Sequence, residues 1–421
     1  MPSRYLLLAF CATVLAWPSA ALQAEEVAPA AANDRPRIGL VLSGGGARGA
    51  AHVGVIRALE EMRVPIDAVA GTSMGAVVGG MFAAGLTGAE IEAAFRELDW
   101  QELLRDRAPR RDLVFRRKQD DRGILAKGSL GFRQGEGVVL PLGLVQGQKI
   151  TQALRAATLR VADVQDFDRL PIPFRALATD LETGEPVVLR SGDLATVLRA
   201  SMSAPGLLAP VEIDGRMLVD GGLVDNLPVS LARDMGVDVV IAVDVSFPLA
   251  DRGGLESAID VSNQMIGIMV RRGTRTSRAE LRGRDVLIEP DLGPMTAVEF
   301  TKVPQVMAAG AAAAGAVRQQ LAALSHSPQQ YAAYLAERGR TAELDEPLAF
   351  VRAGPKSQED ADRIEAVFGG LSGEPLSFQK DIRGKAPLTL FFFMTTACSA
   401  CYEELKEIHE FVGKNPGRVV D

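Results

Sequence analysis

The sequence predicts an α/β fold with a mostly parallel central sheet. Short apolar runs of strand length alternate with longer stretches of helical character, and glycine-rich turns join them. The order strand, helix, strand, helix is typical of such a sheet. The chain has 421 residues, of which 47% are hydrophobic, so it can bury at least one large core.

The first predicted unit is a strand over residues 38–42, a glycine loop over 43–49 and a helix over 50–62. The strand residues are apolar throughout, which is typical of a strand buried on both faces. The helical segment repeats apolar residues at a spacing that places them on one side. A glycine-rich loop between a strand and a helix start can point backbone N–H groups at an anion.

A serine between two glycines follows the second predicted strand, residues 66–70. Gly71 and Gly75 permit a sharp bend, so that the hydroxyl of Ser73 projects where a helix over 74–84 begins. Unpaired N–H groups and the helix dipole favour negative charge at that place. The pattern predicts a nucleophile elbow.

The rest of the predicted core runs to about residue 323 and has no internal repeat. Its expected elements are strands over 174–178, 187–189, 218–219, 237–243 and 286–288, and a helix over 194–200.

Charge argues against nucleic acid as a partner, because the net charge is −7 and the chain has no global basic field. One stretch, residues 96–118, is locally basic and contains Leu113, Val114 and Phe115. It has two interpretations: a solvated charged face, or a contact with an anionic membrane surface.

The N-terminus resembles an export signal. Arg4, an apolar run over 5–17 and small residues up to Ala24 predict a signal peptide over residues 1–24. A Pro/Ala-rich linker follows over 25–36. We therefore expect an exported protein that is periplasmic, associated with the outer membrane, or secreted.

The glycine loop has three interpretations. As Gly44-x-Gly46-x-x-Gly49 it matches the dinucleotide-binding pattern, although the acidic residue that this reading needs at the end of the second strand is not there: Asp67 lies near the strand's start. As an oxyanion hole, the loop would stabilise the charge that forms on a carbonyl attacked by Ser73. As plain turn glycines, it would do neither.

A catalytic serine needs a base, and the chain has only three histidines. His52 falls on a helix where packing is its expected role, while His326 and His409 lie outside the predicted core. A carboxylate can replace histidine if burial raises its pKa. Asp220 is the best candidate, because it ends a strand and precedes Gly221 and Gly222, although Asp-Gly-Gly alone is most often a turn.

Three motifs in this order resemble the patatin-like phospholipase family: the glycine loop, the G-x-S-x-G elbow and D-G-G. The resemblance extends to residues 199–205 and 225–228, which in the family help to shape the site. It implies a three-layer sandwich with helices on both faces of the sheet, and a hydrolase domain over residues 37–323.

The resemblance also implies the roles of individual residues. Ser73 would be the nucleophile and Asp220 the base. The oxyanion loop would comprise Gly44, Gly45, Gly46 and Arg48, with Gly71, Gly75, Gly221 and Gly222 as flanking motif residues. Family members cleave acyl esters of lipids without a catalytic metal, so we expect no cofactor, and a phospholipid or other lipid ester as substrate.

The C-terminal part changes character. Residues 324–346 are polar and predict a linker, and residues 347–378 resemble the start of a POTRA-type module. Residues 379–421 resemble a truncated thioredoxin-like fragment with one strand, a CxxC turn and one helix. Cys398 and Cys401 form a candidate redox pair there.

Two rival functions remain beside the lipid hydrolase. One is an NAD(P)-binding oxidoreductase that uses the glycine loop. The other is an envelope tethering or interaction protein whose hydrolase site is idle. Bound NAD(P)H would favour the first, and a pure protein that turns over no ester would favour the second.

Overall fold

The computed structural model describes residues 35–106, 131–133, 137–139 and 141–341. The predicted signal peptide, most of the first linker and the basic residues 107–118 lie outside the described residues. The POTRA-like and thioredoxin-like segments, with Cys398 and Cys401, also lie outside them.

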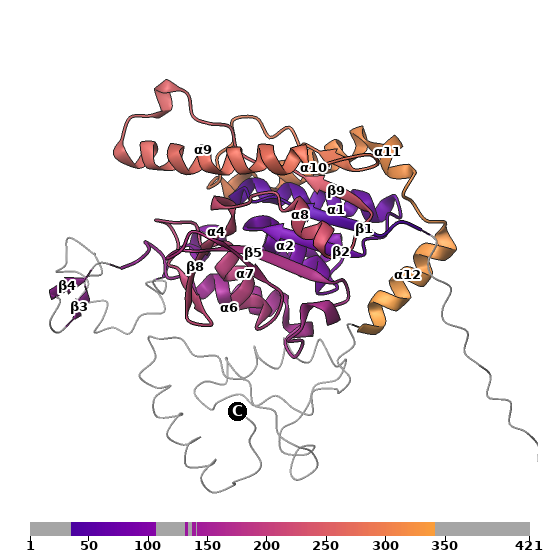
Figure 1. The fold of residues 1–421 in the computed structure, drawn as a ribbon, viewed down its shortest axis with the longest axis horizontal. Coiled ribbons are helices and arrows are strands. Elements are labelled where there is room, and N and C mark those ends of the chain that lie inside the picture. Colours follow the sequence, from indigo (N-terminus) through magenta and orange to yellow (C-terminus); the bar gives the residue numbers. More distant parts are fainter. Residues whose placement is uncertain (1–34, 107–130, 134–136, 140, 342–421) are drawn as a thin grey trace, which may run out of the picture. The chain divides into compact units, whose positions relative to one another are not determined.

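The core is one eight-stranded mixed sheet (Figure 1). The strand order is β10-β9-β1-β2-β5-β8-β7, with β6 paired to β5. Strands β10, β9, β1, β2 and β5 run parallel, whereas β6, β7 and β8 pair antiparallel. The strands are β1 (Ile38–Leu42), β2 (Ala68–Thr72), β5 (Phe174–Asp180), β6 (Pro186–Leu189), β7 (Val211–Ile213), β8 (Arg216–Asp220), β9 (Val239–Val243) and β10 (Val286–Ile288). A separate hairpin pairs β3 (Gly131–Arg133) with β4 (Gly137–Val139).

Helices cover both faces of the sheet, as the three-layer expectation requires. Side chains of β1 alternate between two buried clusters: Leu40 packs with α1, α2 and α10, and Val41 packs with α8. The helices are α1 (Ala51–Glu61), α2 (Met74–Ala83), α3 (Gly88–Glu97), α4 (Trp100–Leu103), α6 (Gln148–Ala157), α7 (Leu194–Ser201), α8 (Val229–Asp234), α9 (Ala258–Ala279), α10 (Val303–Ala316), α11 (Arg318–Ala322) and α12 (Pro328–Thr341).

The second strand differs from its predicted range. It was expected over residues 66–70, whereas β2 spans Ala68–Thr72. The reason is pairing across the sheet: Gly71 lies opposite Ala176 and Thr72 opposite Leu177 of β5. The strand therefore continues to the residue directly before Ser73.

The predicted linker over 324–346 also differs from the structure, because α12 occupies most of its described part. The Tyr334 hydroxyl donates to a backbone carbonyl just before β2 at 3.0 Å. The Arg338 guanidinium lies 4.2 Å from the centre of the Phe82 ring and donates to the Phe82 carbonyl at 2.6 Å. These contacts are made by aromatic and charged side chains. The segment therefore lacks the periodic apolar residues from which a helix is predicted in a sequence.

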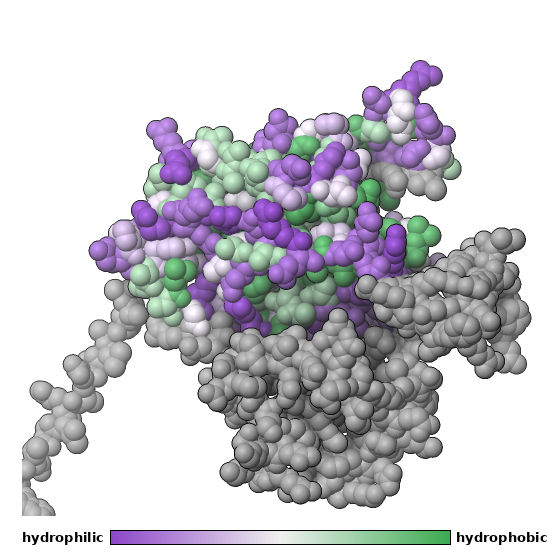
Figure 2. All heavy atoms as spheres, turned by 180° about the vertical axis from the view of Figure 1, so that it is seen from behind, coloured by the Kyte–Doolittle hydropathy of each residue, from purple (hydrophilic) through white to green (hydrophobic). Residues whose placement is uncertain are grey.

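Helix α9 has an unusual surface. Its large exposed side chains include Val261, Met265, Ile268 and Met269, which recur at helical spacing on one face. Elsewhere, Figure 2 shows polar and apolar residues interspersed over the coloured part of the face it presents. Within the described part of the chain, no helix is long and apolar enough to cross a membrane.

Candidate active site

Ser73 lies at the tip of the turn between β2 and α2. Its backbone angles are φ 54° and ψ −125°, in the left-handed half of conformational space that non-glycine residues rarely adopt. The side chain is 8% exposed, and the backbone N–H donates to the Ser201 hydroxyl at 3.0 Å. The strained turn that the sequence predicts is therefore present.

The glycines of the elbow are required by close packing. A Cβ atom at Gly75 would lie 2.2 Å from the backbone oxygen of Leu42, at the end of β1. A Cβ atom at Gly71 would lie 2.7 Å from the Gly75 backbone. Helix α2 therefore begins directly against the neighbouring strand, which any side chain at these positions would prevent.

Asp220 ends β8 and faces the serine. The Ser73 hydroxyl donates to Asp220 Oδ2 at 2.6 Å, although the two residues are 147 positions apart. The other carboxylate oxygen, Oδ1, accepts the N–H of Gly222 at 2.8 Å. The Thr179 hydroxyl donates to the Asp220 carbonyl at 2.8 Å and fixes the strand end. The carboxylate is thus oriented by its own backbone turn.

Burial changes the acidity of this carboxyl group. It raises the pKa of Asp220 to about 6, against the opposing effect of the hydrogen bonds from Ser73 and Gly222. At pH 7 the carboxylate is therefore mainly ionised, yet it is far more basic than an ordinary aspartate. A group with this pKa can accept a proton from a serine and return it at neutral pH.

The glycine loop lies directly against the serine. A Cβ atom at Gly44 would come within 3.0 Å of Ser73 Cβ and 2.5 Å of Asn226 Oδ1. The Gly44 N–H donates to the Asn226 carbonyl. Among the interactions of the described residues, none uses the N–H of Gly45 or Gly46 as donor. These two N–H groups are the ones that the loop can offer to an oxyanion.

The side chain of Arg48 is hydrogen-bonded to neighbouring loops. Its guanidinium donates four hydrogen bonds to backbone carbonyls, among them Val245 at 2.9 Å and Met295 at 2.9 Å. Arg48 therefore joins the glycine loop to the loops after β9 and β10. The motif predicted a residue of the oxyanion loop, and the structure shows a residue that positions it. A sequence pattern cannot show in which direction the side chain turns.

Two positioning residues were not singled out by the sequence. The Ser201 hydroxyl accepts the Ser73 N–H and donates to a carbonyl of β5 at 2.6 Å. The Asn226 amide donates to the Gly44 carbonyl at 3.3 Å and to the Ser246 hydroxyl at 3.0 Å. Both residues lie in the stretches over 199–205 and 225–228 that the family resemblance had marked. The resemblance therefore indicated these segments but not which side chains position the site.

Histidine plays no part in the described site. His52 is fully buried, and its Nε2 lies 2.8 Å from the carbonyl oxygen of Ser43. Burial lowers the pKa of His52 to about 4, so it is neutral at pH 7. His326 binds the backbone of Arg63 through its own backbone N–H. Neither of these two histidines contacts Ser73, while His409 lies outside the described residues.

Comparison with known proteins finds a family that resembles part of this chain. Residues 40–233 match the family described as patatin-like phospholipase. This segment of the chain is similar to that family. This segment contains both Ser73 and Asp220, and it ends at the residue before the last of α8. The three motifs that the sequence showed therefore all fall within the matched range.

Curated relatives are similar to this chain over about half of its length. An NTE family protein of Mycobacterium tuberculosis is 40% identical over 227 residues, which cover 52% of this chain and 53% of that protein. Lysophospholipase NTE1 of Pyricularia oryzae is 36% identical over 208 residues, which cover 49% of this chain and 12% of that protein. This chain thus spans about half the length of the mycobacterial relative and a smaller share of the fungal one.

Two solved structures are similar to this chain at lower sequence identity. VipD from Legionella pneumophila is 16% identical with a TM-score of 0.39, covering 92% of this chain and 82% of VipD. ExoU from Pseudomonas aeruginosa, solved with SpcU, is 16% identical with a TM-score of 0.35, covering 69% of this chain and 53% of ExoU.

The described residues hold no group of three or more histidine, cysteine, aspartate or glutamate side chains that could bind a metal ion.

Proposed function

We propose that this protein is a serine acyl hydrolase that cleaves lipid esters through a Ser73–Asp220 dyad. The observation that carries the proposal is the 2.6 Å hydrogen bond from the Ser73 hydroxyl to Asp220 Oδ2 at a strained strand-to-helix turn. The similarity to the patatin-like phospholipase family and the lysophospholipase name of the fungal relative support lipid esters as the substrate class.

The geometry supports a two-stage mechanism. Asp220 accepts the hydroxyl proton as Ser73 Oγ attacks the ester carbonyl carbon. The negative charge that develops on the carbonyl oxygen is stabilised by the N–H groups of Gly45 and Gly46. The carbon–oxygen bond to the leaving alcohol then breaks, Asp220 returns the proton to that alcohol, and an acyl-serine remains. In the second stage Asp220 takes a proton from water, whose oxygen attacks the acyl carbon. The bond to Ser73 Oγ then breaks, Asp220 returns the proton to Ser73, and the fatty acid is released.

The structure does not favour the oxidoreductase alternative. Asp67 accepts the Ile38 N–H at 2.7 Å and pairs with Arg35 at 2.6 Å, before β2 begins. It is therefore held at the opposite end of the strand from the place where a ribose-binding carboxylate is needed. Ser73 also packs against Gly44, on the loop that a dinucleotide would have to approach.

The membrane-surface interpretation of the sequence concerned residues 96–118, of which 107–118 lie outside the described residues. Helix α9 offers a different surface of this kind among the described residues. We infer that its apolar face meets anionic lipid, because Arg271, Arg272 and Arg275 follow the exposed Met265 and Ile268 on the same helix. Co-sedimentation with vesicles tests this inference. Met265→Ser/Ile268→Ser should reduce binding to phosphatidylglycerol vesicles, and unchanged binding would contradict it.

The decisive experiment is ester hydrolysis by the full chain, with short- and long-chain esters. Ser73→Ala should reduce turnover on the order of 10³-fold or more, because it removes only the nucleophilic oxygen. Ser325→Ala is the matched control. It removes a hydroxyl that donates to the Leu321 carbonyl and should keep wild-type activity. Turnover that persists in folded Ser73→Ala contradicts the dyad. A wild-type protein inactive on every ester favours the tethering alternative.

A further inference from the structure

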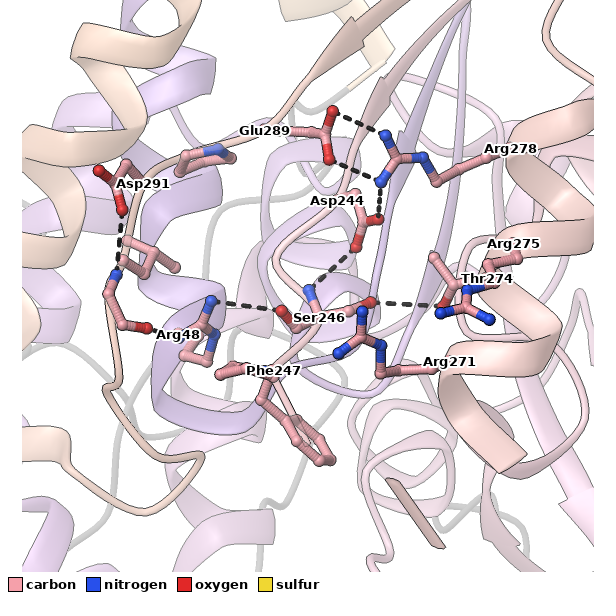
Figure 3. Close-up of a pocket in the computed structure, with 14 residues that line it drawn as sticks. Arg48, Asp244, Ser246, Phe247, Arg271, Thr274, Arg275, Arg278, Glu289 and Asp291 are labelled. Carbon is pink, nitrogen blue, oxygen red and sulfur yellow. Dashed lines mark hydrogen bonds and ion pairs between the residues drawn. The ribbon is translucent and has the colours of Figure 1, made fainter. Parts of the chain in front are cut away.

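A cavity of about 440 Å³ is bordered by Arg48, which follows the glycines of the loop, and by residues of α9 (Figure 3). Its walls come from the segments after β1, β9 and β10 and from α9. It is lined mainly by polar side chains, including Arg48, Asp244, Ser246, Thr274 and Arg275. Helix α9 lies outside the range that matches the patatin-like family, so that match assigns nothing to this cavity.

The cavity occupies a position that the sheet topology favours for ligands. From β1 the chain crosses through α1 to β2, while β9 lies on the other side of β1. The connections therefore diverge between β1 and β9, and the cavity lies at the carboxyl ends of these strands. Open α/β sheets bind ligands in the crevice at such a point.

Two of the three acidic side chains that line the cavity are paired with Arg278. Arg278 forms a two-pronged ion pair with Glu289, at 2.6 and 2.7 Å, and also contacts Asp244 at 3.3 Å. Asp291 accepts the N–H of Gly293. Figure 3 shows Asp291 on the side of Arg48, across the cavity from the arginines of α9.

Two arginines of the cavity wall form no ion pair in the described part of the chain. Arg271 and Arg275 are one helical turn apart on α9, and both line the cavity. Among the ion pairs and hydrogen bonds of the described residues, none involves either guanidinium. The Ser246 and Thr274 hydroxyls also line the cavity, 3.3 Å from each other, and the Thr274 hydroxyl donates to the Val270 carbonyl at 2.9 Å. Two arginine guanidinium groups one turn apart are donors that phosphate oxygens prefer.

We propose that this cavity binds a phosphate group through Arg271 and Arg275. The site is coupled to the elbow by Asn226, whose amide donates to Ser246, Thr274 and the Gly44 carbonyl. Gly44 in turn packs against Ser73. The part of this inference that concerns substrates rests on the proposed function. In that case the cavity would hold a phosphate group of the ester substrate while Ser73 attacks its acyl group.

Binding is measured first, without hydrolysis, in full-length Ser73→Ala protein. Titration calorimetry with inorganic phosphate and glycerol 3-phosphate probes free phosphates. Co-sedimentation with phosphatidylcholine vesicles, with and without phosphatidic acid, probes the lipid headgroup. We compare Arg271→Gln/Arg275→Gln with Arg272→Gln/Arg282→Gln, which removes two exposed charges of the same region outside the cavity lining.

The first pair of changes should weaken binding in at least one arm by about ten-fold or more, because each removes a charged donor. The control pair should change binding little. The arm that depends on Arg271 and Arg275 identifies the source of the phosphate. Equal binding by both double variants in every arm would overturn the proposal.

Kinetics then separate this inference from the proposed function. Two soluble substrates share one acyl chain: a lysophosphatidic acid and the corresponding monoacylglycerol. Arg271→Gln/Arg275→Gln should raise KM about ten-fold for the phosphate ester alone, with kcat and the neutral ester unchanged. Hydrolysis without this selective change counts against the phosphate site and leaves the hydrolase intact. Arginine-dependent phosphate binding without any hydrolysis supports the site and refutes the hydrolase.

Discussion

Replacing Asp220 by asparagine should abolish the proposed activity and, at neutral pH, stabilise the fold. Asparagine has nearly the same shape but cannot accept the proton of Ser73. It also removes a negative charge that the structure holds in a largely buried place. Activity should therefore fall while the free energy of unfolding rises. Replacement of a residue with only a structural role would not produce both changes.

The pKa of Asp220 sets the size of the gain. Burial raises that pKa from an ordinary 3.8 to about 6. The folded state therefore keeps its proton at pH values where the unfolded chain has lost it, so wild-type stability falls as pH rises through this window. Two pKa units correspond to about 3 kcal/mol, of which about 2 kcal/mol accrues between pH 4 and pH 7. Asparagine has no such dependence.

Urea denaturation of both proteins at pH 4, 5, 6 and 7 measures this difference. The free energy of unfolding of Asp220→Asn relative to wild type should rise by about 2 kcal/mol across the series. Asp163→Asn, in an exposed carboxylate, controls for the loss of one negative charge. A difference between Asp220→Asn and wild type that stays constant with pH would refute the reasoning, because the carboxylate would then carry no burial cost.

Three further predictions follow from the same structure. Wild-type kcat/KM should fall as pH is lowered through about 6, since the Asp220 carboxylate must be ionised to act as base; a profile flat down to pH 5 would exclude it. Ending the chain after residue 341 should leave esterase activity unchanged, whereas ending it after residue 323 removes α12 and should lower the melting temperature by about 5 °C or more. Ester hydrolysis should withstand dialysis against EDTA; loss that added metal restores would require a different mechanism.

The sequence predicted best those elements whose signal is local. The strands at residues 38–42 and 286–288 have the predicted ends, because each is a short apolar run bounded by polar or glycine residues. Helix α12 was missed for the opposite reason. Its attachment depends on Tyr334 and on Arg338 over Phe82, which are contacts between distant segments with no periodic pattern.

The pairing of Ser73 with Asp220 could not be worked out from spacing, since 147 residues separate them. It came from the family resemblance, and the sheet explains it: β2 and β8 both pair with β5, so their ends lie near one another. The pairing is antiparallel on one side and parallel on the other. The register places both strand ends beside the same part of β5, because Thr72 lies opposite Leu177 and Asp220 lies opposite Ala178.

The arginines of α9 illustrate what a sequence leaves open. Arg271, Arg272, Arg275 and Arg278 read as one solvated charged face, which is the usual meaning of such a run. Packing divides them: Arg278 is paired with Glu289 and Asp244, Arg272 is exposed outside the cavity, and Arg271 and Arg275 line it. These different surroundings depend on where α9 lies relative to the ends of β9 and β10, because that position decides which of the four arginines contacts a carboxylate, the cavity or solvent. If phosphate binding depends on Arg271 and Arg275 but not on Arg272, the position of α9 beside the sheet determines the preference for phosphate-containing substrates. That helix lies outside the segment that carries Ser73.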